Sequence, residues 1–326
     1  MIKYTTTEST DIQKTSLNPQ PTLKTPKSFQ ETISSYWQLT KPKVVALLLI
    51  TAIVGMCLAT DDSVPFSTLF FGLIGMGFAM GGSAAVNQVV DHHIDAKMRR
   101  TQNRPLVLGQ ITPNQALIFA LSLIFCGVLI LEVWVNRLTA VLTLLGAVGY
   151  AVIYTLFLKR ATPQNIVVGG LAGAIPPLLG WTATSGEFHG NALLPVLIIF
   201  TWTPPHFWAL AIHRADEYRE AKIPMLPVTH GIEFTKTLII FYTVLLLLVS
   251  WLPYITRMSG WLYAVTATVL GCVFLGYALK LKFNPTTQTA MRTFGYSIVY
   301  LFALFIGLLF DHYLIDSTSF LITNGV

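Results

Sequence analysis

Residues 66–105, FSTLFFGLIGMGFAMGGSAAVNQVVDHHIDAKMRRTQNRP, join a long apolar run to a dense cluster of polar and charged side chains. The apolar part, residues 66–86, suits a helix that crosses the bilayer core, which takes about 20 residues. The whole chain of 326 residues is 53% hydrophobic and 11% charged, and its mean hydropathy is +0.62. Soluble domains carry about 25% charged residues. The sequence therefore predicts an integral membrane protein.

Nine apolar stretches are candidate membrane spans, and the first and fifth are marginal in length. They cover residues 44–60, 66–86, 114–133, 138–158, 166–183, 192–212, 237–256, 260–279 and 293–310. The predicted fold is all-α, a polytopic bundle of nine transmembrane helices.

The basic residues test this topology, because short cytoplasmic segments collect Lys and Arg. With the N-terminus inside, 19 of the 21 basic residues fall on inner segments, and only Arg137 and Arg257 fall outside. A missed span would scramble this alternation. We therefore expect a cytoplasmic N-terminus and a periplasmic C-terminus.

The first 35 residues are rich in Thr, Ser, Pro and Lys and contain no apolar run, which predicts a disordered cytoplasmic tail. Residues 36–315 form the predicted membrane domain, and residues 316–326 a short tail. The N-terminal tail lacks the Arg-rich, acid-poor composition of a transit peptide, and the first span is typical of a signal anchor. Both features favour a bacterial inner membrane. The three cysteines lie far apart in apolar runs and predict neither disulfides nor a thiolate metal site.

Acidic and amide side chains follow the second span at regular spacing. In a helix Asn87, Asp91 and Asp95 lie at i, i+4 and i+8 and point the same way. Carboxylates stacked on one face repel each other unless a cation lies between them. Hard oxygen ligands of this kind suit Mg²⁺, which keeps open positions for water and phosphate oxygens.

Basic side chains come next in the chain, and Arg binds phosphate through paired hydrogen bonds. They are Arg99, Arg100 and Arg104. A metal site beside them suggests a diphosphate site, although arginines after a span are also typical of an ordinary solvated inner loop. His92 and His93 point about 100° apart on a helix and cannot share one ion with both aspartates, so we interpret them as solvent or headgroup contacts.

A second polar cluster, HRADEYREAKIPMLPV at residues 213–228, follows the sixth span on the same side. Asp216 and Glu217 are candidate ligands for a metal, with Tyr218 beside them, while an ordinary amphipathic surface turn is the alternative. A third inner segment, LKRATPQN at residues 158–165, supplies Lys159 and Arg160, which contact the anion or only set topology.

Two later spans carry further signals. Gly169 and Gly173 have GxxxG spacing, which predicts close helix packing, and Pro176 and Pro177 should break that helix. The sixth span contains FTWTPPHFWALAI, in which His206 is an ionisable group at membrane depth. Such a group is a candidate functional residue, here beside aromatic rings that would suit a flat ligand. A neutral His bonded to a backbone carbonyl is the alternative.

These motifs together resemble the UbiA-type intramembrane prenyltransferases over about residues 36–315. The stretches that carry the resemblance are LTKPKVV at 39–45, DHHIDAKMRRTQNRP at 91–105, LKRATPQNIVVGGLAGAIPPLLGW at 158–181, TPPHFWALAI at 203–212 and EYREAKIPMLPV at 217–228. The third and fourth resemble the haem-directed branch of that family.

The resemblance implies transfer of a farnesyl group from farnesyl diphosphate to a vinyl group of haem B, giving haem O and diphosphate. It further implies that Mg²⁺ is held at the first motif, Asn87, Asp91 and Asp95. Arg100 and Arg104 would meet the diphosphate, and Glu217 and Tyr218 would form the second motif. His206 is a candidate haem ligand. Implied partners are the lipid bilayer and a haem A synthase or terminal oxidase, and no nucleic acid is expected.

The chain departs from the family pattern at His92 and His93, where the family usually has Arg and Asp. At Glu217 it keeps a carboxylate in place of Asp. Two other functions fit parts of the sequence. A prenyltransferase for an aromatic or quinone-precursor acceptor would keep the metal motif but has no use for TPPHFWALAI. A divalent-cation transporter would want carboxylates at the bilayer midplane, and no span carries one there.

Overall fold

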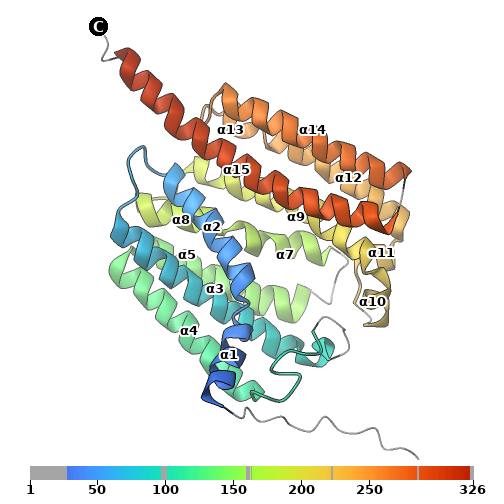
Figure 1. The fold of residues 1–326 in the computed structure, drawn as a ribbon. Helices are drawn as coiled ribbons and strands as arrows, with labels where there is room; N and C mark the ends of the chain where they lie inside the picture. Colours follow the sequence, from blue (N-terminus) through green and yellow to red (C-terminus); the bar gives the residue numbers. More distant parts are fainter. Residues whose placement is uncertain are drawn as a thin grey trace, which may run out of the picture.

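The computed structural model describes residues 28–96, 101–158, 162, 164–221, 223–284 and 286–323, and these contain helices and no strand (Figure 1). The elements are α1 Phe29–Leu39, α2 Pro42–Leu58, α3 Phe66–Asp95, α4 Pro113–Trp134, α5 Arg137–Val148, the π-helix η1 Gly149–Leu158, α7 Asn165–Ala174, α8 Pro176–Ser185, the short 3-10 turn η2 Gly190–Ala192, α9 Leu193–His213, α10 Ala215–Glu220, α11 Leu226–Thr229, α12 Ile232–Val249, α13 Leu252–Ile255, α14 Trp261–Phe283 and α15 Thr287–Thr323. The predicted all-α class is confirmed. Helices satisfy their own backbone polar groups, which lipid cannot do.

Seven helical segments of the described ranges are individually long and apolar enough to cross a membrane. They are Phe66–Asp95, Pro113–Trp134, Asn165–Ser185, Gly190–His213, Ile232–Ile255, Trp261–Phe283 and Gln288–Leu314. Helices α1 and α2 pass the same test only as a pair bent by 49°, and Arg137–Ala151 is a shorter apolar helix. The protein is therefore a multi-pass membrane protein, and the count of nine spans stays a prediction.

The helices form two groups joined by the fifth predicted span (Figure 1). Helices α3, α4 and α5 pack on one another, and α9, α12, α14 and α15 form the second group. Between them, α7 contacts α9 and η1, while α8 contacts α2 and α5. As predicted, the chain breaks before Pro176, since α7 ends at Ala174 and α8 begins at Pro176. This break lets the two halves of one span pack against different neighbours.

Glycines allow two pairs of helices to touch through their backbones. A Cβ atom at Gly55 of α2 would lie 1.9 Å from the carbonyl oxygen of Pro177 in α8, and one at Gly180 of α8 would lie 1.9 Å from that of Ala52. Gly75 and Gly127 bring α3 and α4 together in the same way. Small residues at membrane-helix interfaces permit this approach.

The first helix lies where the sequence predicts a disordered tail. Helix α1 begins at Phe29, and its N-cap Ser28 accepts a hydrogen bond from the Glu31 backbone N–H at 3.2 Å. Phe29, Ile33 and Trp37 recur at helical spacing and are exposed. Helix α1 therefore includes residues 29–35 of the segment whose composition predicts disorder. Residues 1–27 lie outside the described residues.

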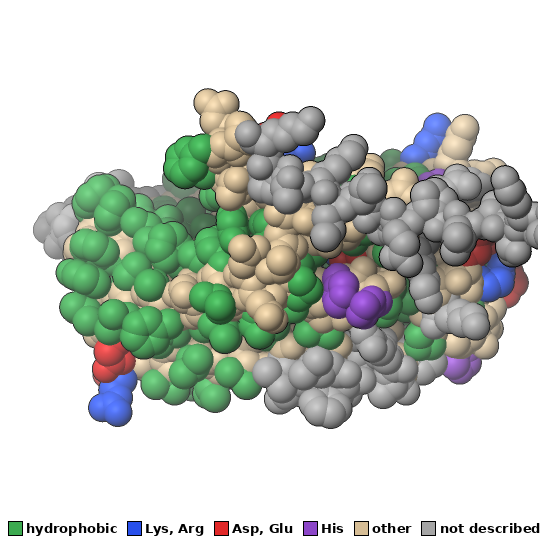
Figure 2. Space-filling view, turned by 90° about the horizontal axis from the view of Figure 1, so that it is seen from below, with side chains coloured by type: hydrophobic (Ala, Val, Ile, Leu, Met, Phe, Trp, Pro, Cys, Tyr) green, Lys and Arg blue, Asp and Glu red, His purple; other side chains and the backbone are tan. Residues whose placement is uncertain are grey.

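The outer faces of the bundle are apolar, as a lipid-facing surface requires. Phe125 of α4 and Leu248 of α12 keep 68% and 63% of their surface exposed. Figure 2 shows hydrophobic side chains over a broad part of one face, with few charged groups among them. Such patches on a soluble protein would be unusual. Here they mark the surface in contact with lipid.

The backbone contact between α2 and α8 gives a stability prediction. Gly180→Ala should lower the thermal denaturation midpoint of the purified protein in detergent, because the new methyl meets a backbone carbonyl that only helix separation can clear. Overpacking of this kind costs about 1–3 kcal/mol. The matched control is Gly276→Ala in α14, where nothing lies within 4 Å of the added Cβ. An unchanged midpoint for Gly180→Ala would contradict the proposed contact.

Candidate active site

The last turns of α3 carry a buried polar face. Asn87, Asp91 and Asp95 are only 5%, 2% and 6% exposed, and they lie within one continuous helix as the spacing predicts. The Asn87 Nδ2 donates hydrogen bonds to Asp91 Oδ2 at 2.9 Å and to Thr155 Oγ1 of η1 at 3.3 Å. At about 1.5 Å per residue, this 30-residue helix is longer than the ~30 Å hydrocarbon core. Its polar end can therefore reach the membrane surface.

Lys41, the residue before α2, is a further hydrogen-bond partner of Asn87. Its Nζ donates a 2.7 Å hydrogen bond to Asn87 Oδ1. Lys41 is one of two described non-glycine residues with positive φ, here 50°, a conformation that L-residues seldom adopt. Lys41 was not among the site residues predicted from the sequence. Its position in LTKPKVV was the available signal of a role here.

Arg104 folds back onto the end of α3 and forms an ion pair with Asp95. The Thr101 Oγ1 also donates to the Asp95 backbone carbonyl at 2.8 Å. The predicted anion-binding Arg104 thus lies at the predicted metal-binding Asp95. The other basic residues predicted to bind the anion, Arg100, Lys159 and Arg160, lie outside the described residues.

Two tyrosines of the π-helix η1 stand beside the aspartates. The rings of Tyr150 and Tyr154 stack with centroids 5.6 Å apart. They lie on the helix that also carries Thr155, the hydrogen-bond partner of Asn87. Neither tyrosine was predicted from the sequence, because both lie within the apolar stretch of a predicted membrane span. π-Helical turns occur often at functional sites, but the sequence did not reveal this one.

Gly169 makes room for the Tyr154 ring. A Cβ at Gly169 would lie 2.3 Å from Tyr154 Cε2, whereas nothing lies within 4 Å of one at Gly173. The close packing predicted for this pair is therefore found only at Gly169, against an aromatic ring. The neighbouring Gly170 provides the contact with α9, through Thr203.

The second motif lies on α10, and its two acidic side chains differ in their exposure to solvent. Glu217 Oε2 is buried and has no hydrogen-bond partner among the described residues. The Asp216 side chain is 89% exposed and pairs with Arg219 on the same helix. Tyr218 packs against the same apolar cluster as Ile94 of the first motif. The structure therefore places Tyr218 at the same apolar cluster as the end of α3, and it leaves the Asp216 side chain on the exposed face.

His206 is buried in α9 among aromatic rings. It is 8% exposed, and its Nδ1 lies 2.6 Å from the Ser297 Oγ of α15. Trp202 and Phe294 stack on the imidazole with centroid separations of 4.1 and 4.5 Å. The alternative prediction, a neutral His bonded to a backbone carbonyl, is wrong because the partner of Nδ1 is the Ser297 hydroxyl.

The donor atoms fit a magnesium site better than a site for a softer metal. Within the described ranges, no three His, Cys, Asp or Glu side chains group as metal ligands. The α3 face offers two carboxylates and an amide oxygen, and Glu217 adds a buried carboxylate oxygen without a partner in the described chain. Mg²⁺ takes few protein ligands and keeps waters or phosphate oxygens. These residues fit that requirement.

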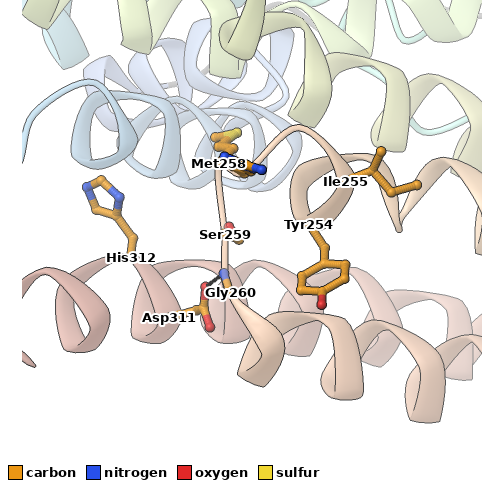
Figure 3. A pocket seen from close by; sticks show the side chains of 8 residues that line it. Tyr254, Ile255, Met258, Ser259, Gly260, Asp311 and His312 are labelled. Carbon is orange, nitrogen blue, oxygen red and sulfur yellow. Dashed lines mark hydrogen bonds between the residues drawn. The ribbon is translucent and has the colours of Figure 1, made fainter. Parts of the chain in front are cut away.

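A cavity lies away from these motifs. It measures about 480 Å³ and is lined by residues of the α13–α14 connection together with Asp311 and His312 of α15 (Figure 3). Asp311 accepts a hydrogen bond from the Tyr263 backbone N–H at 3.1 Å and so caps α14. His312 lies in this cavity, at the other end of the bundle from α10 (Figure 1). It is therefore remote from the α3 and α10 motifs.

Comparison with known proteins defines the class. The sequence matches the UbiA prenyltransferase family over residues 48–310. The chain belongs to this family and is a prenyltransferase. The fold agrees, since a digeranylgeranylglyceryl phosphate synthase superposes with a TM-score of 0.74 at 17% identity, covering 87% of this chain and 99% of that one. A UbiA homolog from Archaeoglobus fulgidus bound to GPP and Mg²⁺ gives 0.56 at 16% identity, covering 84% and 99%.

Relatives of similar sequence indicate which branch of the family this chain resembles. Protoheme IX farnesyltransferase 2 of Pseudoalteromonas atlantica is 60% identical over 279 residues, which cover 86% of this chain and 92% of the relative. Protoheme IX farnesyltransferase of Alcanivorax borkumensis is 59% identical over 281 residues, covering 86% and 93%. These relatives match the branch that the motifs in the middle of the sequence resemble.

Proposed function

We propose that the protein transfers a farnesyl group from farnesyl diphosphate to a vinyl group of haem B, with addition of water, to give haem O and diphosphate. The class of reaction rests on family membership. The choice of acceptor rests on relatives of 57–60% identity that are named protoheme IX farnesyltransferase. The observation in the structure that carries the chemistry is the buried face formed by Asn87, Asp91 and Asp95.

The charged groups divide between metal and anion in this proposal. Asn87, Asp91, Asp95 and Glu217 would hold Mg²⁺, since they supply the buried oxygen atoms. Arg104, together with Arg100, Lys159 and Arg160, would bind the diphosphate, because guanidinium and ammonium groups neutralise phosphate charge. Asp216, which the sequence also suggested as a ligand, has no such part because its side chain pairs with Arg219 on the exposed face.

The reaction needs charge stabilisation and exclusion of water. Mg²⁺ supplies Lewis-acid stabilisation of the leaving diphosphate when it is bound. Basic side chains fixed in place favour cleavage of the carbon–oxygen bond, and its electron pair leaves with the diphosphate. The surrounding helices keep water from the allylic cation. The vinyl π electrons then form the new carbon–carbon bond, and a water molecule adds to the resulting cation and releases a proton. No protein nucleophile is required.

His206 is our candidate for contact with the haem. It lies in α9 seven residues before the helix ends at His213, which places it about 10 Å along the helix from that end. Helix α10, with Glu217 and Tyr218, follows directly. A haem beside His206 would therefore lie on the same side of the bundle as the diphosphate site.

The assignment is tested by incubating the purified protein with haem B, farnesyl diphosphate and Mg²⁺ and following haem mass. We expect the mass of haem O from the wild type. Loss of one buried charge-stabilising group typically costs about 10²–10³ in rate, and we expect a loss of this size for Asp91→Ala. Removal of Mg²⁺ by chelation should also stop the reaction. Unmodified haem from the wild type, or equal product from Asp91→Ala, would contradict the proposal.

The different surroundings of Glu217 and Asp216 give a matched pair of variants. Glu217→Gln should lower the rate about 10-fold or more and raise the Mg²⁺ concentration needed for half-maximal rate, because the variant loses a buried charged ligand. Asp216→Asn removes only an exposed pair, which is worth about 0–1 kcal/mol, and should keep near wild-type kinetics. The reverse order of effects would place the ligand at Asp216.

We also propose nine spans in a bacterial inner membrane, with the N-terminus cytoplasmic and the C-terminus periplasmic. The distribution of 19 of 21 basic residues supports this topology. In the described chain, α5 and η1 occupy the fourth predicted span. The product would then be available in the membrane to a haem A synthase or a terminal oxidase, and co-purification would test either partner.

Fusions at the C-terminus test the number of spans. With nine spans, alkaline phosphatase fused after Val326 is exported and active, while green fluorescent protein fused there is dark. If α5 and η1 do not cross, the chain has eight spans and both signals reverse. A phosphatase fusion between η1 and α7 checks the same span independently, since it is inactive if α5 and η1 cross the membrane and active if they do not.

A further inference from the structure

The hydrogen bonds around His206 determine which of its nitrogens carries the proton. Ser297 Oγ lies 2.6 Å from the Phe294 backbone carbonyl and 2.6 Å from His206 Nδ1. A carbonyl oxygen can only accept, so the single Ser297 hydroxyl proton must point to Phe294. The Ser297 oxygen is left as an acceptor, and His206 Nδ1 must donate to it. The neutral imidazole then carries its proton on Nδ1 and a lone pair on Nε2.

The rest of the ring is fixed by packing. Trp202 and Phe294 both stack on the imidazole, at interplanar angles of 20° and 27°. Two rings of this size do not fit on one face of an imidazole, so they cover both faces. With the faces covered and Nδ1 occupied, the edge that carries Nε2 remains. Among the residues that the structure describes, the hydrogen bond of the His206 ring is the one at Nδ1.

We propose that Ser297 is a positioning residue, which holds His206 in the Nδ1–H tautomer so that Nε2 binds the iron of the haem substrate. The inference rests on the proposed function, because it takes haem as the acceptor. Neutral imidazole binds metals through the nitrogen that carries the lone pair, and the hydrogen bond at the other nitrogen selects which one that is. Axial ligation would hold the porphyrin in a fixed orientation while its vinyl group reacts.

A purely structural role is the competing explanation. Ser297 also accepts a 2.7 Å hydrogen bond from Trp202 Nε1 at its backbone carbonyl, so these contacts join α9 to α15. If these hydrogen bonds only joined the two helices, a variant that weakened them would lower the stability of the protein. It would not change the spectrum of bound haem, which reports the ligand at the iron.

The experiment uses the full-length protein purified in detergent, with haem B and without farnesyl diphosphate. Absorption and resonance Raman spectra of the ferrous complex should show histidine ligation in the wild type. His206→Ala should lose the iron–histidine band, and added imidazole should restore nitrogen ligation. Rescue by imidazole would also show that the variant is folded.

Ser297→Ala and Ser297→Thr separate tautomer control from packing. Without an acceptor for Nδ1–H the ligand becomes less basic, so Ser297→Ala should shift the iron–histidine band to lower frequency. It should also weaken haem binding about 10-fold, as loss of a hydrogen-bond partner of a metal ligand typically does. Ser297→Thr retains the hydroxyl and should restore both values. The matched control is Ser250→Ala, which removes another fully buried hydroxyl, one that bonds Tyr300 of α15 at 2.7 Å.

Different negative results would overturn either this inference alone or the proposed function as well. If the wild type forms haem O but its iron–histidine band is unchanged in His206→Ala or in Ser297→Ala, this inference is overturned and the proposed function stands. If Ser250→Ala changes the band as much as Ser297→Ala, the effect is structural and the inference also fails. If the wild type neither binds nor modifies haem B, the proposed function fails with it.

Discussion

Burial of two carboxylates at one end of α3 is the constraint on which the arrangement of the site depends. A buried charge costs several kcal/mol unless it is paired and hydrogen-bonded. The compensation comes from separate parts of the chain, since Arg104 of the following loop pairs with Asp95 and Asn87 donates to Asp91. Asn87 in turn binds Lys41 of α2 and Thr155 of η1. Satisfying these carboxylates therefore brings four segments together at the membrane surface.

The apolar part of the bundle supports that site by close helix contact. Lipid gives little hydrophobic drive for helices to associate, so backbone approach and packing must supply it. Gly55 and Gly180 let α2, the helix that follows Lys41, touch α8. Gly169 accommodates the Tyr154 ring, and Gly170 contacts α9, the helix that carries His206. The same helix, α7, thus contacts both η1, beside the proposed metal site, and α9, which carries the proposed haem ligand.

Much of the fold could be predicted from hydropathy and charge alone, because a lipid environment requires long apolar helices and puts basic residues on one side. The acidic face of α3 could be predicted too, because the i, i+4, i+8 spacing survives in any helix. Other members of the site could not. Lys41, Tyr154 and Ser297 lie 46, 67 and 210 positions from Asn87 in the sequence, and nothing local indicates that such residues meet. Asp216 and Glu217 are adjacent acids, and only the direction in which α10 packs distinguishes them.

The sequence by itself determined the class of the protein, its all-helical build and the common face of the polar residues in its first motif. Each of these depends on composition or on spacing within one helix, which a single chain segment encodes. Only the tertiary structure shows that Glu217 Oε2 is buried while the Asp216 side chain is exposed, and that Lys41 donates a hydrogen bond to Asn87. It also shows that the partner of His206 Nδ1 is the Ser297 hydroxyl rather than a backbone carbonyl. These outcomes depend on how separate helices pack, and the pattern within any one helix does not specify its neighbours.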